Sequence, residues 1–141
     1  LLWGCEVIQV ERGPFKSSCE LADKLEKRGT DLVVLAGFLW LIPKSLLEAF
    51  PNKIINIHPA LLPKYGGKGM HGENVHKAVE EADEMESGIT IHYINEEYDK
   101  GDVIFQARCD VKGLDFKQIG KEVLKLEHIH FPQVICKLLK K

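Results

Sequence analysis

Two polar side chains interrupt an apolar run at residues 54–58, where Asn56 and His58 alternate with isoleucines. Residues two apart on a strand point to the same face, so we expect these side chains to project together. Buried polar groups need hydrogen-bond partners or a function. The structural alternative is a satisfied core histidine beside an asparagine at a turn. The functional alternative is that both side chains belong to a site.

The first 58 residues alternate between strand-like and helix-like patterns. Ser17 and Glu20 have the spacing of a capping box, and the helix after them is expected to stop at Gly29. Pro43 suits the first turn of a second helix, which we expect to run through Phe50. The remaining segments are rich in β-branched or apolar residues and are predicted to be strands: residues 5–10, 32–37 and 54–58.

The second half of the chain carries four further patterns. Residues 73–81 are predicted to be helical, with valines on one face. Residues 89–94 and 103–107 are predicted to form an antiparallel pair, because only a short turn separates them. Apolar spacing from Asp115 onward predicts a helix, and Pro132 is expected to begin a second one.

The β-α-β-α-β order predicts an α/β fold with an open, mostly parallel twisted sheet, flanking helices and an antiparallel strand pair near the C-terminal side. The 141 residues fit a single domain. Ligands of such folds bind beyond the carboxyl ends of the strands. Asn56 and His58 end their predicted strand, so the topology also directs attention to them.

The bulk composition indicates an ordinary globular protein. Nineteen basic and twenty-one acidic side chains give a net charge of -2, and no basic cluster suggests a nucleic-acid partner. No stretch approaches the ~20 apolar residues of a membrane span, and the first residues lack a signal-peptide pattern. We therefore expect a cytoplasmic protein without a nucleic-acid or membrane partner.

Neither the cysteines nor the histidines are spaced like metal ligands. The four cysteines include no C-x-x-C pair and are expected to be free thiols. His71 and His76 are five residues apart across a glycine-rich segment, which is not the i, i+4 spacing of a helical zinc pair. We expect no metal.

Four segments resemble the folate-dependent formyltransferases, in order and at suitable spacing. They are residues 35–38 (LAGF), 55–63 (INIHPALLP), 87–94 (SGITIHYI) and 98–104 (YDKGDVI). The resemblance extends from Asp31 to the C-terminus. It implies a Rossmann-like formyltransferase fold and the transfer of a formyl group from 10-formyltetrahydrofolate to the amine of glycinamide ribonucleotide, a step of de novo purine biosynthesis.

The resemblance assigns catalysis to Asn56, His58 and Asp99. An amine that attacks a formamide builds negative charge on the formyl oxygen, and a donor already aimed there stabilises that charge. Asn56 and a protonated His58 can both donate, and a nearby carboxylate would keep His58 charged. Asp99 is expected to be that carboxylate because the family's aspartate precedes an x-Gly step. Asp102 is the alternative.

The resemblance also implies that the pterin binds largely through backbone groups, a mode that tolerates side-chain variation. The expected folate-binding residues are Trp40, Leu41 and Ile42 on one side, and Asn95, Glu96, Glu97 and Gly101 on the other. Several relatives carry arginine at the position of Trp40, so a half-exposed aromatic without a folate contact is an equal alternative there.

Two further residues receive roles from the resemblance. Glu127 is expected to contact the ribose hydroxyls of the nucleotide. His92 lies within an apolar strand near the site, and we expect it either to support the site from behind or to belong to the core. The loop at residues 64–70 is expected to pack over the phosphate end of the nucleotide. The expected partners are therefore small molecules, and the oligomeric state stays open.

One part of the family's site is missing from this sequence. The nucleotide phosphate is expected on a Gly-Ser/Thr-Asn loop after the first strand, whereas residues 12–14 read Arg-Gly-Pro. We therefore expect an N-terminally incomplete domain at residues 1–141, with weak or absent nucleotide binding if the chain is the whole molecule. The alternatives are a formyltetrahydrofolate hydrolase, an inactive folate-binding module, and a methionyl-tRNA formylating enzyme, which the lack of a basic C-terminal domain disfavours.

Overall fold

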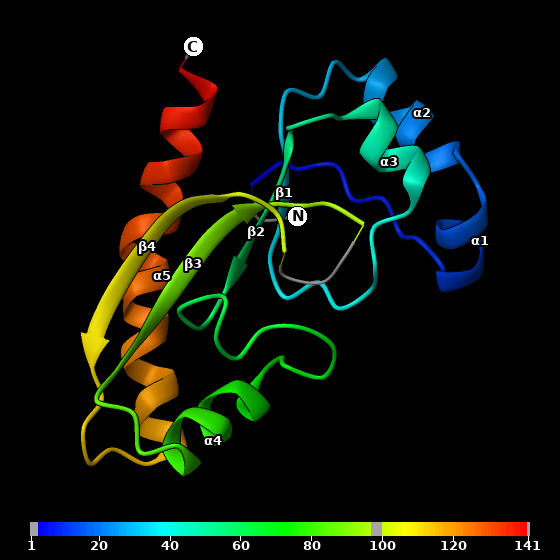
Figure 1. Cartoon of the computed structure of the whole chain (residues 1–141). Helices are drawn as coiled ribbons and strands as arrows, with labels where there is room; N and C mark the ends of the chain where they lie inside the picture. Colours follow the sequence, from blue (N-terminus) through cyan, green and yellow to red (C-terminus); the bar gives the residue numbers. More distant parts are fainter. Residues whose placement is uncertain (1–2, 97–99, 141) are drawn as a thin grey trace.

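The computed structural model describes residues 3–96 and 100–140, in which short helices and strands alternate before one long final helix (Figure 1). The helices are α1 (Arg12–Ser17), α2 (Glu20–Lys27), α3 (Lys44–Ala49), α4 (Glu73–Glu81) and α5 (Phe116–Leu139). The strands are β1 (Val33–Leu35), β2 (Ile54–His58), β3 (Glu86–Tyr93) and β4 (Val103–Asp110). No helix in the described ranges is both long enough and apolar enough to cross a membrane.

The four strands form one sheet in the order β1-β2-β3-β4. β1 and β2 are parallel, whereas β2 with β3 and β3 with β4 are antiparallel. The predicted antiparallel pair near the C-terminal side is therefore confirmed. The sheet is mixed rather than mostly parallel among the described strands, because β3 runs back along β2 instead of repeating the parallel crossover that joins β1 to β2.

The main core lies between the sheet and α5, which runs alongside β3 and β4 in Figure 1. Burying a large aliphatic side chain stabilises a fold by roughly 1.5–3 kcal/mol, so this layer fixes α5 on the sheet. The buried residues that strands and helix contribute to it include Ile55, Ile57, Ile89, Ile91, Ile119, Val123, Phe131 and Val134.

A second core cluster lies beyond β1 and β2, where α1, α2 and α3 gather (Figure 1). Its buried residues are Phe15, Ala22, Ile42, Leu46, Phe50 and Ile54. Phe38 and Trp40 pack against this cluster, and their ring centroids lie 5.4 Å from that of Phe15. The segment after β1 therefore packs against the cluster that α1 and α3 help to form.

The N-terminal part differs from expectation. Residues 5–10 form no strand: they pair with no other strand in the described residues, and the Val7 side chain is 66% exposed. The predicted capping box is also absent, because the Ser17 hydroxyl donates to the carbonyl of Gly13 within α1 and α2 begins only after Cys19. The predicted stop at Gly29 is confirmed. Gly29 has φ +69° and follows the helix as a C-terminal cap residue.

The C-terminal helix is continuous, so the prediction of a second helix beginning at Pro132 was wrong. Asp115 and Gln118 form a reciprocal capping box at the start of α5, and the helix then runs through Pro132 to Leu139. Proline removes one backbone donor and usually breaks a helix. Here Phe131 and Val134 are both buried in the main core, so packing on either side of Pro132 holds the two halves in line.

Candidate functional site

Asn56 and His58 lie on the face of β2 that points away from the α5 core. In the register with β3, Asn56 lies opposite His92 and His58 lies opposite Thr90. Direct cross-strand pairs share one face of a sheet. Four polar side chains therefore gather on this face, while Ile55 and Ile57 occupy the reverse face among isoleucines.

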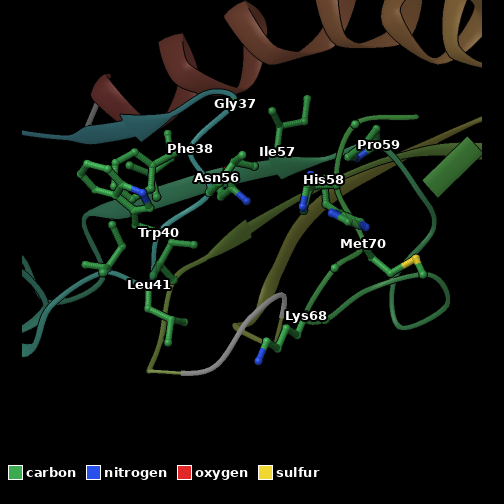
Figure 2. A pocket seen from close by; sticks show the side chains of 18 of the residues that line it. Gly37, Phe38, Trp40, Leu41, Asn56, Ile57, His58, Pro59, Lys68 and Met70 are labelled. Atoms are coloured by element: carbon green, nitrogen blue, oxygen red, sulfur yellow. The ribbon is translucent and has the colours of Figure 1, made fainter. Parts of the chain in front are cut away.

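A cleft of about 520 Å³ opens over this polar face, and Asn56 and His58 both line it (Figure 2). Clefts that bind small ligands typically enclose roughly 300–1,000 Å³. His58 is 4% exposed and Asn56 is half-buried, so both side chains reach the cleft from within the sheet. The two residues that the alternation of β2 singled out are thus brought together in one cavity.

The hydrogen bond made by His58 determines where its ring carries a proton. Nε2 of His58 lies 2.7 Å from the backbone carbonyl oxygen of Tyr65. A carbonyl oxygen can only accept, so Nε2 must be the protonated donor nitrogen. In the neutral ring Nδ1 then carries no proton, and a donor at Nδ1 requires the imidazolium form.

A second histidine acts on the electrostatics of this region. His76, on α4, is half-buried, and its ring faces Gly120 of α5. Burial is the main cause that lowers the pKa of His76, electrostatic interaction with His58 lowers this pKa further, and Glu73 opposes both effects. Two protonated imidazoles are therefore disfavoured here, and His76 is the one kept neutral by its surroundings.

The segment after β1 forms an apolar wall of the cleft. Trp40, Leu41 and Ile42 all line the cavity, and Figure 2 shows Trp40 and Leu41 beside it. Trp40 is half-buried and packs edge-on against Phe38, with 5.9 Å between ring centroids. Trp40 thus packs on the aromatic cluster and also lines the cleft.

The opposite wall comes from the segment after β3 and from α5. Asn95 lines the cleft and so does Glu127, although 32 positions separate them in the sequence. His92 lies opposite Asn56 on the neighbouring strand and is fully buried, and its Nδ1 lies 2.9 Å from the carbonyl oxygen of Tyr93. His92 is not among the lining residues, so it lies next to the site without lining the cleft.

The remaining predicted residues fall outside the cleft or outside the described residues. Glu96 is exposed and is not a lining residue. Gly101 does not line the cleft, but its backbone lies so close to Tyr93 that a side chain does not fit. A Cβ atom there would lie 1.6 Å from the carbonyl oxygen of Tyr93. Asp102, the alternative carboxylate, is exposed and does not line the cavity. Glu97 and Asp99 lie outside the described residues.

Sequence reasoning placed the glycine-rich loop over the nucleotide but named none of its residues as site residues. The structure shows this loop as a further wall of the cleft, where Gly67, Gly69 and Gly72 all have positive φ. Lys68 and Met70 lie between these glycines and also line the cavity (Figure 2). The repeated glycines were the available signal, since such backbone angles favour glycine. Among the described residues no cluster of three potential metal ligands occurs.

A buried network holds the chain that leaves β2 after His58. The Thr90 hydroxyl donates to the carbonyl of Ala60 at 2.7 Å and accepts from the backbone N–H of Leu62 at 3.0 Å. The Gln106 amide donates to the Thr90 hydroxyl at 2.9 Å and to the Leu62 carbonyl at 3.0 Å. Buried groups satisfied in this way fix a single local conformation, so β3 and β4 both anchor the end of β2.

Comparison with known proteins associates this fold and site with one family. Residues 10–135 match the model of the formyl transferase family. The chain is 50% identical over 120 residues to the chloroplastic phosphoribosylglycinamide formyltransferase of Arabidopsis thaliana. The matched region covers 84% of this chain and 41% of that relative. The corresponding Bacillus subtilis enzyme is 38% identical over 120 residues, covering 84% of this chain and 59% of that enzyme.

Solved structures agree with the fold. The crystal structure of glycinamide ribonucleotide transformylase 1 from Symbiobacterium toebii matches 94% of this chain and 62% of its own length, with a TM-score of 0.82 and 32% identity. The Rossmann-like α/β fold is thereby confirmed. The chain spans roughly 40–60% of the length of these relatives.

Proposed function

Because the chain belongs to the formyl transferase family, we propose that it forms the catalytic part of an enzyme that transfers a formyl group from 10-formyltetrahydrofolate to the amine of glycinamide ribonucleotide. Relatives named for this substrate class support the proposal. The observation that carries it is the placement of Asn56 and His58 together in a cleft of suitable size at the carboxyl end of β2.

The cleft suits a flat, partly apolar donor such as a reduced pterin. Leu41, Ile42 and Ile94 supply apolar surface, and the resemblance to the family assigns the polar contacts of the pterin to backbone groups. We assign the donor to the space between the wall of Trp40, Leu41 and Ile42 and the segment that contains Asn95. The proposed roles of Glu96, Glu97 and Gly101 concern the other side of the same ring.

The reaction needs charge stabilisation more than it needs a covalent intermediate. The amine nitrogen attacks the formyl carbon, and the carbonyl π bond opens to place negative charge on the formyl oxygen. The bond between the formyl carbon and folate nitrogen then breaks, and the proton lost by the amine ends on that nitrogen. Asn56 and His58 are the proposed donors to the charged oxygen, an interaction worth about 2.7–4 kcal/mol per donor.

The tautomer of His58 determines which of its ring nitrogens can donate to the formyl oxygen. Because Nε2 donates to Tyr65, donation to the formyl oxygen falls to Nδ1 of the imidazolium. We assign Asp99 as the carboxylate that stabilises the imidazolium and holds the proton-shuttling water. Glu127 lines the cleft opposite the donor wall, where we place the ribose hydroxyls of the nucleotide.

An absorbance assay of 10-formyltetrahydrofolate with and without glycinamide ribonucleotide tests the proposal. We expect loss of the formyl donor only when the nucleotide is present. Donor loss without the nucleotide would identify a hydrolase instead. Donor binding without any loss would identify a folate-binding module and would contradict the proposal. The cytoplasmic location stays a prediction, since the Arabidopsis thaliana relative is described as chloroplastic.

A further inference from the structure

The imidazole of His58 is held by a backbone atom that is itself held from outside the cleft. The carbonyl oxygen of Tyr65 accepts the Nε2–H of His58 at 2.7 Å. Tyr65 lies seven residues after His58, at the start of the glycine-rich loop. The direction of this carbonyl, and with it the orientation of the catalytic ring, therefore depends on what fixes the backbone of Tyr65.

The backbone of Tyr65 adopts a conformation that tyrosine does not favour. Its φ is +57°, in the left-handed region, where a bulky side chain approaches its own backbone closely. Gly66 and Gly67 follow immediately and add little restraint of their own. Such a conformation persists only where the surroundings over-determine it, so the restraint must come from the Tyr65 side chain and its partners.

The Tyr65 side chain ends on a carboxylate outside the cleft. Its hydroxyl donates to Oε1 of Glu84 at 2.8 Å, and Nζ of Lys64 lies 3.2 Å from the same oxygen. The backbone N–H of Glu84 bonds to the carbonyl of Val79, so Glu84 is fixed to the end of α4. The Glu84 side chain is 24% exposed, compared with 68% for Lys64. Glu84 is thus the more rigid end of this contact.

The charge states suit a persistent hydrogen bond. The Tyr65 hydroxyl is the main cause that lowers the pKa of Glu84, and Lys64 lowers it further. Burial, followed by Glu84, raises the pKa of Tyr65. At neutral pH the pair is therefore a phenol that donates to a carboxylate, which is a stronger bond than one between neutral groups.

The Tyr65 side chain packs against the main core on one side and borders open space on another. A hollow of about 230 Å³ lies beside it, and Tyr65, Glu84 and Gln106 are among the residues that line it. Space of this size leaves room for the loop to shift if its anchor is lost. The bond between Tyr65 and Glu84 then adds a directional restraint to this packing.

We propose that Tyr65 and Glu84 are positioning residues that hold the His58 imidazole in the orientation and tautomer required for formyl transfer. The proposal rests on the proposed function for its catalytic consequence, but its structural core does not. The chain of contacts runs from Glu84 to the Tyr65 hydroxyl and from the Tyr65 carbonyl to Nε2 of His58, which lines the cleft. Neither Tyr65 nor Glu84 is assigned a contact with substrate.

Three variants and one control separate positioning from general stabilisation. Tyr65→Phe removes only the hydroxyl, whereas Glu84→Ala removes the acceptor together with the ion pair to Lys64. Glu84→Gln keeps an oxygen acceptor and should restore the wild-type behaviour. Glu86→Ala is the control. Glu86 is an exposed acid that lines the same hollow, and its carboxylate pairs with Arg108 rather than with Tyr65.

The first measurement is the ¹H–¹⁵N resonance of Nε2–H in His58, identified by its loss in His58→Gln. We expect a single resonance protected from exchange with water in the wild-type chain, in Glu84→Gln and in Glu86→Ala. In Tyr65→Phe and Glu84→Ala we expect the resonance to broaden and to exchange rapidly. An unchanged resonance in both folded variants would overturn the proposal. This readout requires no activity, so it is independent of the proposed function.

The second measurement is steady-state formyl transfer. Misorientation of a catalytic group lowers turnover more than ground-state binding, so we expect kcat about tenfold lower in Tyr65→Phe and Glu84→Ala, with KM for the folate unchanged. Restoration of kcat in Glu84→Gln supports the proposal. A lowered melting temperature with unchanged kcat in both variants would show that the pair only stabilises the loop.

Discussion

The chemistry assigned to this chain depends on two side chains of one short strand. Asn56 and His58 share the face of β2 that lines the cleft, while Ile55 and Ile57 belong to the core. This alternation follows directly from strand geometry, so the two residues could be predicted from sequence. The third member of the predicted trio, Asp99, came from the family motif and stays a prediction.

The contact that orients His58 could not be predicted from the sequence. The acceptor is a backbone carbonyl, which every residue possesses, and its direction depends on a positive φ at Tyr65. A tyrosine does not predict a positive φ, whereas the glycines that follow it do. A sequence therefore indicates which side chains can react more readily than it indicates what holds them in place.

The role of the Asn56 carboxamide can be tested by truncation. Removing one oxyanion donor typically lowers kcat about 10²–10³-fold, so we expect Asn56→Ala to reduce turnover by about 100-fold with little change in KM for the folate. Gln133→Ala is a matched control, because it removes an exposed carboxamide on α5. If Asn56→Ala turned over as rapidly as Gln133→Ala, Asn56 would have no part in the mechanism.

At the scale of helices and strands, α4 joins the site to α5 through a histidine that burial keeps neutral. The pKa of His76 is lowered by burial first and by His58 second, while Glu73 raises it. Because the pKa of His76 is lowered in the folded state, the unfolded chain binds more protons than the folded chain below pH about 6.5, the ordinary pKa of histidine. Stability is thus highest above this pH and falls as the pH drops toward the lowered value.

Denaturant unfolding at pH 7.5 and pH 5.5 measures this contribution. We expect the free energy of unfolding to fall more in the wild-type chain than in His76→Gln, whose side chain does not titrate. His128→Gln, which removes an exposed histidine of α5, should behave like the wild type. An equal loss of stability in all three chains would contradict the assignment of His76 as a buried neutral imidazole.

Local patterns predicted elements well where packing agreed with them. The bounds of β2 and α4 match the predicted residues 54–58 and 73–81. Residues 5–10 have strand-like composition but pair with no strand in the described part of the chain, and such propensity has little effect without a partner. Pro132 is the opposite case, because the burial of Phe131 and Val134 outweighs the local tendency of proline to end a helix.

At the scale of the whole molecule, the cleft is assembled from segments distant in sequence. The wall after β1, the end of β2, the glycine-rich loop and α5 each contribute lining residues. Parallel pairing of β1 with β2 brings the first two together, and the α5 core brings Glu127 to the same cavity. Sequence patterns identified most of these segments, but only the topology shows that they enclose one space.

Transfer of a ¹³C-labelled formyl group tests the central claim most directly. The chain is mixed with labelled 10-formyltetrahydrofolate and millimolar glycinamide ribonucleotide, so that weak nucleotide binding does not limit the reaction, and the product is followed by NMR. We predict that label appears on the nucleotide amine and that His58→Ala slows its appearance by at least ~100-fold. Release of the label only as formate, or equal rates in the two chains, would contradict the assignment of a formyl-transfer site at Asn56 and His58.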